Sequence, residues 1–320
     1  MELTEILEEI SVGFRSHKEK SQKLNNYVNL VREALEEHGA LYENEVITVE
    51  KFDIEKDESG DTFIQGSYGT HTAIKHPSYD VDADIGLILN DINTRLDIRE
   101  KIYFQLKRKF PNYNVELKKP CITIDFKDGY KIDVAIYSRH NDEIWFHNSI
   151  QGTETITRAK PKELIRFFND RYSEDNIKRS VVRLVKHFIK IASDTLEIDE
   201  KNKIPSIATN LIIVDKNLKE YGSVEETLFY NIGYVVDEFI NYVESNGYSG
   251  PSLESLCVGN TFYKVENINE VIDVLKKVQI NLKNKQYSEL IGNSVFSKIY
   301  EKHKIKFNTS PMGTLGEKDE

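Results

Sequence analysis

The periodicity of apolar residues predicts two kinds of structure in the first half of the chain. Apolar residues at intervals of three and four predict one or two long helices at the start, over residues 3–15 and 24–35. Apolar residues that alternate with polar ones predict four strands, at 61–65, 81–89, 121–126 and 130–137. An amphipathic helix is predicted between the second and third of these strands, over about 96–110, and Pro111 marks its end.

Helical periodicity dominates the second half of the chain. The predicted helices lie at 161–170, 176–193, 206–219, 224–245, 267–283 and 286–303. The change from strands to helices predicts an α+β protein with two lobes. We expect a lobe over residues 1–155 that carries the strands and the long N-terminal helix, a helical lobe over 156–307 and a flexible polar tail over 308–320.

Three aspartates alternate with apolar residues in the segment YDVDADIGLIL, residues 79–89. Side chains alternate between the two faces of a strand, so Asp80, Asp82 and Asp84 share one face. The opposite face carries Val81, Ala83, Ile85, Leu87 and Leu89. Carboxylates held this close repel one another. A divalent cation that prefers hard oxygen ligands, Mg²⁺ or Mn²⁺, would remove that repulsion.

Two simpler roles for these aspartates need no catalytic metal. One is a strand edge that acidic residues keep solvated, and the pattern alone leaves this open. The second is an EF-hand calcium loop, which also begins with alternating acidic residues. The EF-hand is rejected because Ile85 stands where that loop needs glycine and Asp91 where it needs glutamate.

A later strand, YKIDVAIY at 130–137, supplies a further acidic residue. Asp133 would face away from Ile132, Val134 and Ile136. Asp125, in the segment ITIDF, competes for the same role. Asp133 is favoured because apolar residues frame it on both sides, so its strand is the better defined of the two.

A glycine–serine pair, Gly66-Ser67, follows the predicted strand 61–65. Glycine lets backbone N–H groups approach an anion closely, and the serine hydroxyl adds a donor. The pair belongs to neither a P-loop nor a dinucleotide-binding motif, and by itself it is typical of a simple turn. The order of strand, Gly-Ser, alternating aspartates and a later single aspartate is more specific, and it predicts a metal-assisted phosphate site.

Basic residues accumulate at the start of the predicted helical lobe. Residues 157–190 hold ten Lys or Arg against four acidic residues, in a chain whose formal net charge is −10. Arg179, Arg183, Lys186 and Lys190 recur at helical spacing and share a face. That face is either an ordinary solvated surface or one wall of a cleft that receives a triphosphate.

Composition excludes several classes of protein. An acidic chain of 320 residues is a poor general binder of long nucleic acid, because phosphate neutralisation supplies most of that affinity. The only cysteines, Cys121 and Cys257, argue against a disulfide scaffold and a zinc ribbon and favour a reducing compartment. The sequence shows neither a signal peptide nor a long apolar run, so we expect a cytoplasmic protein with no membrane partner.

Taken in order, these motifs resemble the nucleotidyltransferase fold of the DNA polymerase β superfamily. Within it they are most similar to the bacterial cyclic GMP-AMP synthase/DncV-like nucleotidyltransferases (CD-NTases). The first-lobe segments that carry the resemblance are QGSYGTHTAI, YDVDADIGLIL and YKIDVAIY. The second-lobe segments are AKPKELIRFF, RSVVRLVKHFIK and IPSIATNLII. The resemblance implies a polymerase β-like core, a mixed sheet with flanking helices, packed against a helical lobe across a cleft.

The resemblance also assigns roles to individual residues. It implies that Asp82, Asp84 and Asp133 are catalytic and hold two Mg²⁺ or Mn²⁺ ions. It implies that nucleotide is bound by Gln65, Gly66 and Ser67 in the first lobe and by Lys186 and Ser206 in the second. The zinc insertion of the animal enzyme is absent, since only two cysteines exist, so activation by long DNA is not expected.

The implied function is the joining of NTPs, ATP among them, into a cyclic di- or trinucleotide second messenger for anti-phage (CBASS) signalling. The implied partners are the NTP substrates and a regulatory or effector protein encoded nearby, and the chain itself is expected to be a monomer. The alternatives are a nucleotidyltransferase that modifies a protein or RNA, as in toxin–antitoxin pairs, a linear oligoadenylate synthase, and a catalytically dead nucleotide sensor.

Overall fold

The structure is a computed structural model, and it describes most of the chain between residues 18 and 292. The described residues are 18–36, 53–54, 62–74, 81–90, 97–150, 153–173, 176–286, 289–290 and 292. The predicted helices 3–15 and, for the most part, 286–303 lie outside these residues, as do Asp80 and the tail 308–320.

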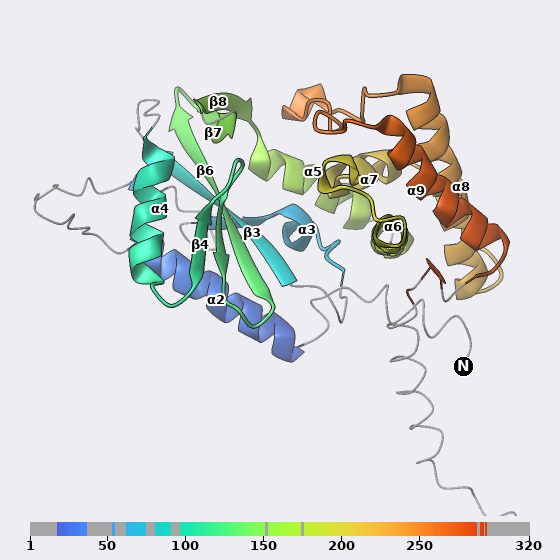
Figure 1. Ribbon diagram of the computed structural model, residues 1–320, viewed down its shortest axis with the longest axis horizontal. Helices are drawn as coiled ribbons and strands as arrows, with labels where there is room; N and C mark the ends of the chain where they lie inside the picture. The colour runs from blue at the N-terminus through green and yellow to red at the C-terminus, as the bar shows by residue number, and fades with distance from the viewer. Residues whose placement is uncertain are drawn as a thin grey trace, which may run out of the picture.

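The described chain forms a sheet-containing lobe followed by a helical lobe (Figure 1). The strands are β1 (Asp53–Ile54), β2 (Thr62–Gln65), β3 (Val81–Asn90), β4 (Asn114–Leu117), β5 (Ile122–Asp125), β6 (Tyr130–His140), β7 (Glu143–Ile150) and β8 (Thr153–Ala159). The helices of the first lobe are α2 (Lys18–Glu36), the single turn α3 (Gly66–Gly69) and α4 (Ile98–Lys109). The second lobe holds α5 (Pro161–Ser173), α6 (Asn176–Thr195), the 3-10 turn η2 (Glu200–Asn202), α7 (Ser206–Val214), α8 (Val224–Asn246), the 3-10 turn η3 (Glu254–Leu256) and α9 (Ile268–Lys283).

The eight strands of the described residues belong to one mixed sheet, and β3 and β6 form its parallel centre. The path of paired strands runs β1-β3-β6-β5-β4, with β2 on β3 and the β7–β8 pair on β6. β2 is antiparallel to β3, and β5 and β7 are antiparallel to β6. This mixed sheet with flanking helices confirms the predicted α+β class.

The two faces of the central strands have different partners. Ile85 and Leu87 of β3 and Ile132 and Val134 of β6 point to one face and pack with apolar residues of α2 and α4. The opposite face carries Asp84 and Asp133, followed along the strands by a smaller apolar cluster that contacts α5. The alternation of the strand therefore places the acidic residues opposite the main core, as its period of two predicts.

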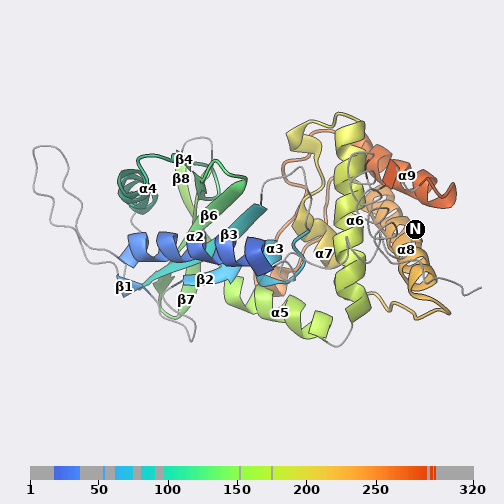
Figure 2. The ribbon, with the colours of Figure 1, turned by 90° about the horizontal axis from the view of Figure 1, so that it is seen from below.

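The helical lobe has a core of its own. One side of α6 is buried against α7, α8 and α9, with Val181, Val185 and Phe188 at 1% exposure or less. Figure 2 shows α6 beside α3 and α7, between the sheet and the outer helices α8 and α9. The basic side of α6 is thereby turned toward the first lobe. None of the described helices has the length and apolarity needed to cross a bilayer.

Several predicted elements are confirmed, and some differ. The strands at 61–65, 81–89, 121–126 and 130–137 and the helix at 96–110 are present within a few residues. The predicted helix 206–219 is wrong beyond Val214, since α7 ends there. Strands β1, β4, β7 and β8 were not predicted, and β8 carries the sheet past residue 155, where the first lobe was expected to end.

Gly233 offers a test of the helical lobe. It lies inside α8, and a Cβ added there would meet no atom within 4 Å. Glycine in a helix interior costs about 0.5–1 kcal/mol relative to alanine, because its unfolded chain has more conformational freedom to lose. Gly233→Ala is therefore expected to raise the free energy of unfolding by about that amount. Chemical denaturation of both proteins would measure it, and a loss of stability would contradict the described helix.

Candidate active site

Strand register aligns three of the predicted site residues. In the antiparallel pair β2–β3, Gln65 lies opposite Asp84, and in the parallel pair β3–β6, Asp84 lies opposite Asp133. The Tyr137 hydroxyl donates to Gln65 Oε1 at 2.9 Å and so fixes the orientation of the Gln65 side chain. Asp82 is two residues before Asp84 on the same face of β3.

Gly66 is required by its neighbours. It follows Gln65 directly and has φ +60°, a conformation that side chains rarely adopt. A Cβ at this position would lie 2.0 Å from Asp84 Oδ2. The absence of a side chain therefore allows the backbone of the Gly-Ser turn to approach the central carboxylate.

The Gly-Ser turn is held by hydrogen bonds within the first lobe. The backbone N–H of Thr72 donates to the Ser67 carbonyl at 2.8 Å, and the Thr70 hydroxyl donates to the Gly66 carbonyl at 3.0 Å. Thr70 and Thr72 also share a hydrogen bond between their hydroxyls at 2.9 Å. This rigid turn presents Ser67 to the space between the lobes.

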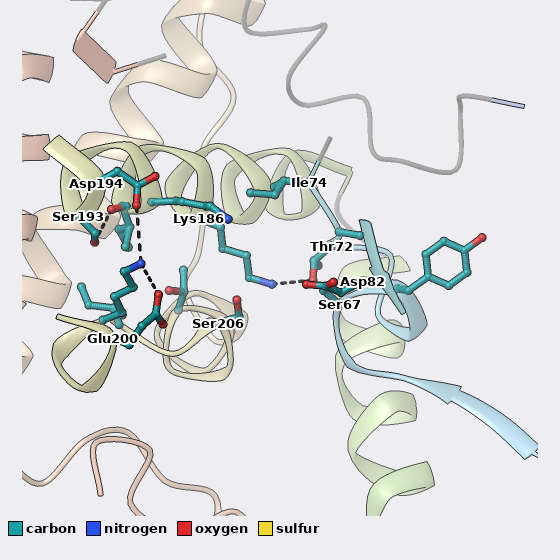
Figure 3. Close-up of a pocket in the computed structure, with 16 residues that line it drawn as sticks. Ser67, Thr72, Ile74, Asp82, Lys186, Ser193, Asp194, Glu200 and Ser206 are labelled. Carbon is teal, nitrogen blue, oxygen red and sulfur yellow. Dashed lines mark hydrogen bonds and ion pairs between the residues drawn. The ribbon is translucent and has the colours of Figure 1, made fainter. Parts of the chain in front are cut away.

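The second lobe sends Lys186 into the same space. Lys186 lies on α6, is 7% exposed, and donates from Nζ to Thr72 Oγ1 at 2.9 Å. Figure 3 shows its side chain directed from α6 toward Thr72, Ser67 and Asp82, with Ser206 nearby at the start of α7. The structure thus brings Ser67, Asp82, Lys186 and Ser206 to the walls of shared cavities.

Two side chains of the second lobe fix the Gly-Ser turn rather than line a phosphate cleft. Arg183 donates to the His71 carbonyl through Nε, at 3.1 Å, and through Nη2. Asn169 donates from Nδ2 to the Gly69 carbonyl at 3.2 Å. The sequence placed Arg183 with Lys186 on one basic face, but the fold uses Arg183 to join the lobes.

Two cavities meet at this junction. The larger has a volume of about 520 Å³ and includes the aligned residues of β2, β3 and β6 together with Leu256, Cys257 and Val258. The smaller, about 320 Å³, extends past Lys186 toward Lys190, Asp194, Glu200 and Lys203. Both include Ser67, Asp82, Lys186 and Ser206 in their walls.

The electrostatics of the site centre on Asp84. Burial raises the pKa of its carboxyl to about 7, and the negative charges of Asp133 and Asp82 contribute to the rise, while Lys186 opposes the shift. Burial lowers the pKa of Lys186 to about 7, and Arg183 contributes to the fall while Asp84 opposes it. Each buried group therefore has too little opposite charge nearby to favour its ionised form. A cation bound at Asp84 or an anion bound at Lys186 would supply that charge.

The donor set fits a hard divalent cation, although its members do not converge on a preformed site. Among the described residues, no three acidic, histidine or cysteine side chains are close enough together to form a metal centre. Asp133 Oδ1 instead accepts a hydrogen bond from Thr123 Oγ1 at 2.5 Å. The carboxylates of Asp82, Asp84 and Asp133 still share one face, and Mg²⁺ and Mn²⁺ prefer such oxygen ligands.

Several contacting residues were not recognised in the sequence. Thr72, Thr123 and Tyr137 each hold a predicted site residue by a side-chain hydrogen bond. Tyr137 was visible on the same strand face as Asp133, because both are odd-numbered residues of β6. No signal in the sequence pointed to Thr72 or Thr123, since a strand or turn pattern does not specify which side chains will meet.

Lys186 gives a prediction that separates stability from binding. The pKa of Lys186 in the folded protein is about 7, below the ordinary value of lysine, about 10.4. Between these two pH values the unfolded chain binds more protons than the folded protein does. The free energy of unfolding therefore increases as pH rises from about 7 to about 10.4. Lys186→Met removes the buried amine and should stabilise the protein at pH 7 by roughly 1–3 kcal/mol, with a flatter stability profile above pH 7. Thermal unfolding as a function of pH would measure this, and nucleotide binding should be lost in parallel.

Comparisons with known proteins add an independent line of evidence. Residues 61–137 match the family described as "Cyclic GMP-AMP synthase DncV-like, nucleotidyltransferase domain". This segment contains the Gly-Ser turn, the alternating aspartates and the strand of Asp133. No curated protein matches the sequence significantly.

Solved structures of CD-NTases share the fold. CdnC of E. coli MS115-1, solved with ATP, is 16% identical with a TM-score of 0.56, covering 87% of this chain and 93% of CdnC. CdnG of Bradyrhizobium diazoefficiens, in complex with GTP, is 12% identical with a TM-score of 0.62, covering 88% of this chain and 93% of CdnG. DncV of Vibrio cholerae, in complex with the linear intermediate pppA(3',5')pG, is 14% identical with a TM-score of 0.56, covering 75% of this chain and 73% of DncV.

The fold of these structures is the polymerase β-like arrangement that the motifs implied, and it extends through the helical lobe. The family match and the shared fold together confirm that this chain is related to the bacterial CD-NTases through its nucleotidyltransferase domain.

Proposed function

We propose that this protein is a metal-dependent nucleotidyltransferase that joins NTPs into a cyclic di- or trinucleotide and releases pyrophosphate. One observation carries the proposal: the register of β2, β3 and β6 aligns Gln65, Asp84 and Asp133 beside the Gly-Ser turn. Lys186 and Ser206 of the second lobe face the same cavities. This combination of carboxylates and phosphate-binding groups suits transfer of a nucleotidyl group.

Asp82, Asp84 and Asp133 would hold two Mg²⁺ or Mn²⁺ ions. When bound, such ions activate an acceptor hydroxyl and stabilise the charge on the leaving pyrophosphate. Ser67 and the backbone amides of its turn would orient the triphosphate, because the turn is held rigidly against α6. Lys186 would exchange the Thr72 hydroxyl for a phosphate oxygen, and the negative phosphate would favour its protonated form.

A cyclic dinucleotide requires two successive transfers in one site, and a cyclic trinucleotide requires one more transfer of the first kind before ring closure. In the first, the hydroxyl of an acceptor nucleotide attacks the α-phosphorus of the donor, the new phosphodiester forms and pyrophosphate leaves. In the second, the linear product's remaining hydroxyl attacks its own α-phosphorus, the ring closes and a second pyrophosphate leaves. For DncV, a linear intermediate has been captured in a solved structure. We propose that the product here is a second messenger for anti-phage signalling that acts on an effector protein.

The test is incubation of the purified protein with Mg²⁺ or Mn²⁺ and all four NTPs, each labelled at the α-phosphate. Phosphatase treatment, chromatography and mass spectrometry would follow. A small phosphatase-resistant product is expected, and its mass would identify the joined nucleotides and the ring size. Label transferred to a protein or RNA, or a linear product only, would contradict cyclic synthesis and favour another nucleotidyltransferase activity.

A second test concerns a partner. The related CdnC has been solved in a complex described as CdnC:HORMA-deltaN. We propose that a regulatory protein also binds this chain. Addition of a cell extract from the native host should raise the yield of cyclic product. Synthesis at full rate by the isolated protein, unchanged by the extract, would contradict the need for a regulator.

A further inference from the structure

The wall of the smaller cavity includes a loop that joins α6 to α7. Its residues Glu200, Lys203 and Ile204 line the cavity, and the loop leads to Ser206 at the start of α7. Lys203 contacts Glu200 at 2.5 Å and Asp194 at 3.8 Å. These are the groups of the second lobe that a triphosphate tail beyond Lys186 would meet.

Asn202 is the buried polar residue of this loop. Its side chain is 6% exposed, whereas Lys201 beside it is exposed. Local hydrogen bonds are few: Asp199 accepts from the backbone N–H of Lys201 at 3.1 Å and, through its carbonyl, from that of Asn202 at 2.8 Å. A polar side chain buried in a loop needs partners, and those of Asn202 come from the N-terminal end of a remote helix.

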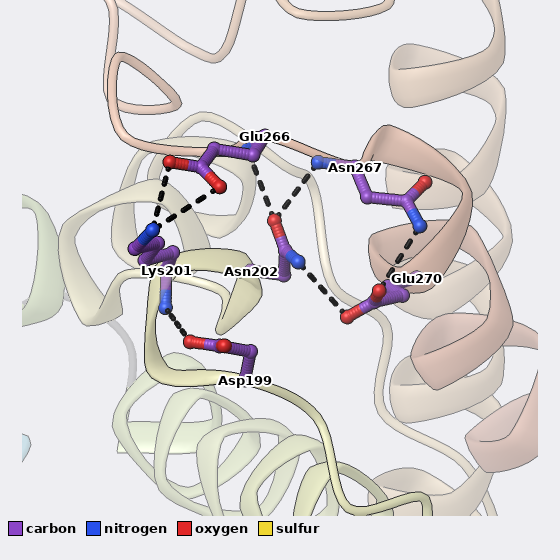
Figure 4. A network of polar contacts seen from close by, with 6 residues as sticks. All are labelled: Asp199, Lys201, Asn202, Glu266, Asn267 and Glu270. Atoms are coloured by element: carbon purple, nitrogen blue, oxygen red, sulfur yellow. Dashed lines mark hydrogen bonds and ion pairs between the residues drawn. The ribbon is translucent and has the colours of Figure 1, made fainter.

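Asn202 joins the loop to the N-terminus of α9 (Figure 4). Its Oδ1 accepts from the backbone N–H groups of Glu266 and Asn267, each at 2.9 Å. Its Nδ2 donates to Glu270 Oε2 at 3.0 Å, and Glu270 Oε1 accepts in turn from Asn267 Nδ2 at 3.0 Å. The side-chain amide of Asn202 thus both donates and accepts hydrogen bonds. Its hydrogen bond to the Glu270 carboxylate is charge-assisted and therefore stronger than one between neutral groups.

The segment between Asn202 and Ser206 is stiff. Lys203 has φ −67° and ψ 140°, and Pro205 has φ −63° and ψ 138°. Both values are extended, and proline restricts its own φ and the conformation of Ile204 before it. A displacement of Asn202 would therefore pass along the chain to Lys203 and Ser206 instead of being absorbed between them.

Resting on the nucleotidyltransferase function proposed above, we propose that Asn202 is a positioning residue for the triphosphate. By tying the loop to α9, it holds Ser206 and Lys203 where the terminal phosphates of the donor nucleotide bind. Lys203 is then a further phosphate-binding residue, which Glu200 and Asp194 keep in place before nucleotide arrives. The phosphate-dependent part of nucleotide affinity should depend on Asn202, and the part contributed by base and sugar should not.

The test compares equilibrium binding of ATP, GTP and their monophosphates to the wild-type protein and to matched variants in Mg²⁺. Asn202→Asp keeps an acceptor for the two amides but sets a second carboxylate against Glu270. It is expected to weaken triphosphate binding roughly tenfold and monophosphate binding less than about twofold. Lys203→Met should have the same selectivity for triphosphates.

A second-site change supplies the rescue. In the double variant Asn202→Asp/Glu270→Gln, the new amide donates to the new carboxylate and still accepts from Asn267, so the network is complete again with its polarity reversed. Triphosphate affinity should return to within about twofold of wild type. Lys201→Ala is the control, since it removes only the exposed ion pair with Glu266 at 3.1 Å and should leave binding unchanged.

Two outcomes with the single variant Asn202→Asp would overturn the inference alone. One is wild-type triphosphate affinity in Asn202→Asp, and the other is an equal loss for triphosphates and monophosphates, which indicates a general structural defect. If the double variant did not recover triphosphate affinity, the contact between positions 202 and 270 would not be what positions the loop, and the proposed network would be overturned. If the wild-type protein bound none of these nucleotides, the proposed function would fail together with the inference.

Discussion

Asp84→Asn is expected to abolish nucleotide transfer while the protein remains folded. Asp84 lies between Gln65 and Asp133 in the sheet, and an amide cannot replace a carboxylate as a ligand for two divalent cations. The rate of product formation should fall by at least about a thousandfold, since the charge stabilisation that bound metal provides would be lost. Single-turnover assays with labelled NTPs would measure it.

Stability provides the internal control for this variant. Burial raises the pKa of Asp84 to about 7, so above that pH the folded protein must keep an ionised carboxylate buried, which costs stability. The folded state holds its proton above the unfolded pKa, and stability falls as pH rises from about 4 toward 7. Asp84→Asn removes that cost, so its melting temperature at pH 8 should equal or exceed that of wild type.

Asp125→Asn is the matched control for activity. Asp125 is the competing acidic residue in the sequence, and it lies on β5 with its carboxylate 3.9 Å from Lys131 Nζ. This ion pair is half-buried and long, and an amide at position 125 can still accept the 2.8 Å hydrogen bond from the Lys127 backbone N–H, so both activity and stability should stay close to wild type. Loss of transfer in Asp125→Asn, with activity kept in Asp133→Asn, would reverse the choice between Asp133 and Asp125 as the third carboxylate.

Gly66→Ala is expected to have the second-largest effect. The new Cβ would lie 2.0 Å from Oδ2 and 2.7 Å from Cγ of Asp84, and the backbone has φ +60°. Either the turn or the carboxylate must move, and a displacement of about 1 Å in a catalytic group costs roughly a hundredfold in rate. The left-handed conformation adds about 1 kcal/mol of destabilisation.

The change at Gly66 should therefore reduce kcat and the free energy of unfolding together. Gly233→Ala is its control, because the same added methyl group meets no atom within 4 Å. Steady-state kinetics and denaturation of both variants would separate a local clash from a general effect of replacing glycine. Wild-type kcat and KM in Gly66→Ala would show that the turn does not approach the site that Asp84 forms.

The strand carrying the alternating aspartates was predictable because its pattern is local. A period of two over ten residues separates Asp82 and Asp84 from Ile85 and Leu87 whatever the rest of the chain does. The same reasoning recognised Asp133 between Ile132 and Val134. Strands β4, β7 and β8 were missed because polar and charged residues are frequent in them, as in the TETITRA of β8.

The basic face of α6 shows where local reasoning ends. Helical spacing groups Arg183 with Lys186, but it does not specify what each side chain contacts. Arg183 donates to the His71 carbonyl and Lys186 to the Thr72 hydroxyl, in a turn more than a hundred residues earlier in the chain. The two residues differ in function because each meets a different group of that turn.

The alternation of the aspartates, the helical nature of the second lobe and the family to which the motifs are related were all predictable from sequence, because periodicity and short motifs are properties of neighbouring residues. Three features could be recognised only in the folded protein: the alignment of Gln65, Asp84 and Asp133, the clash that makes Gly66 necessary, and the link from Asn202 to α9. Each of these depends on strand register or on packing between segments remote in the chain, and pairings of that kind are specified by the sum of many contacts rather than by a local pattern.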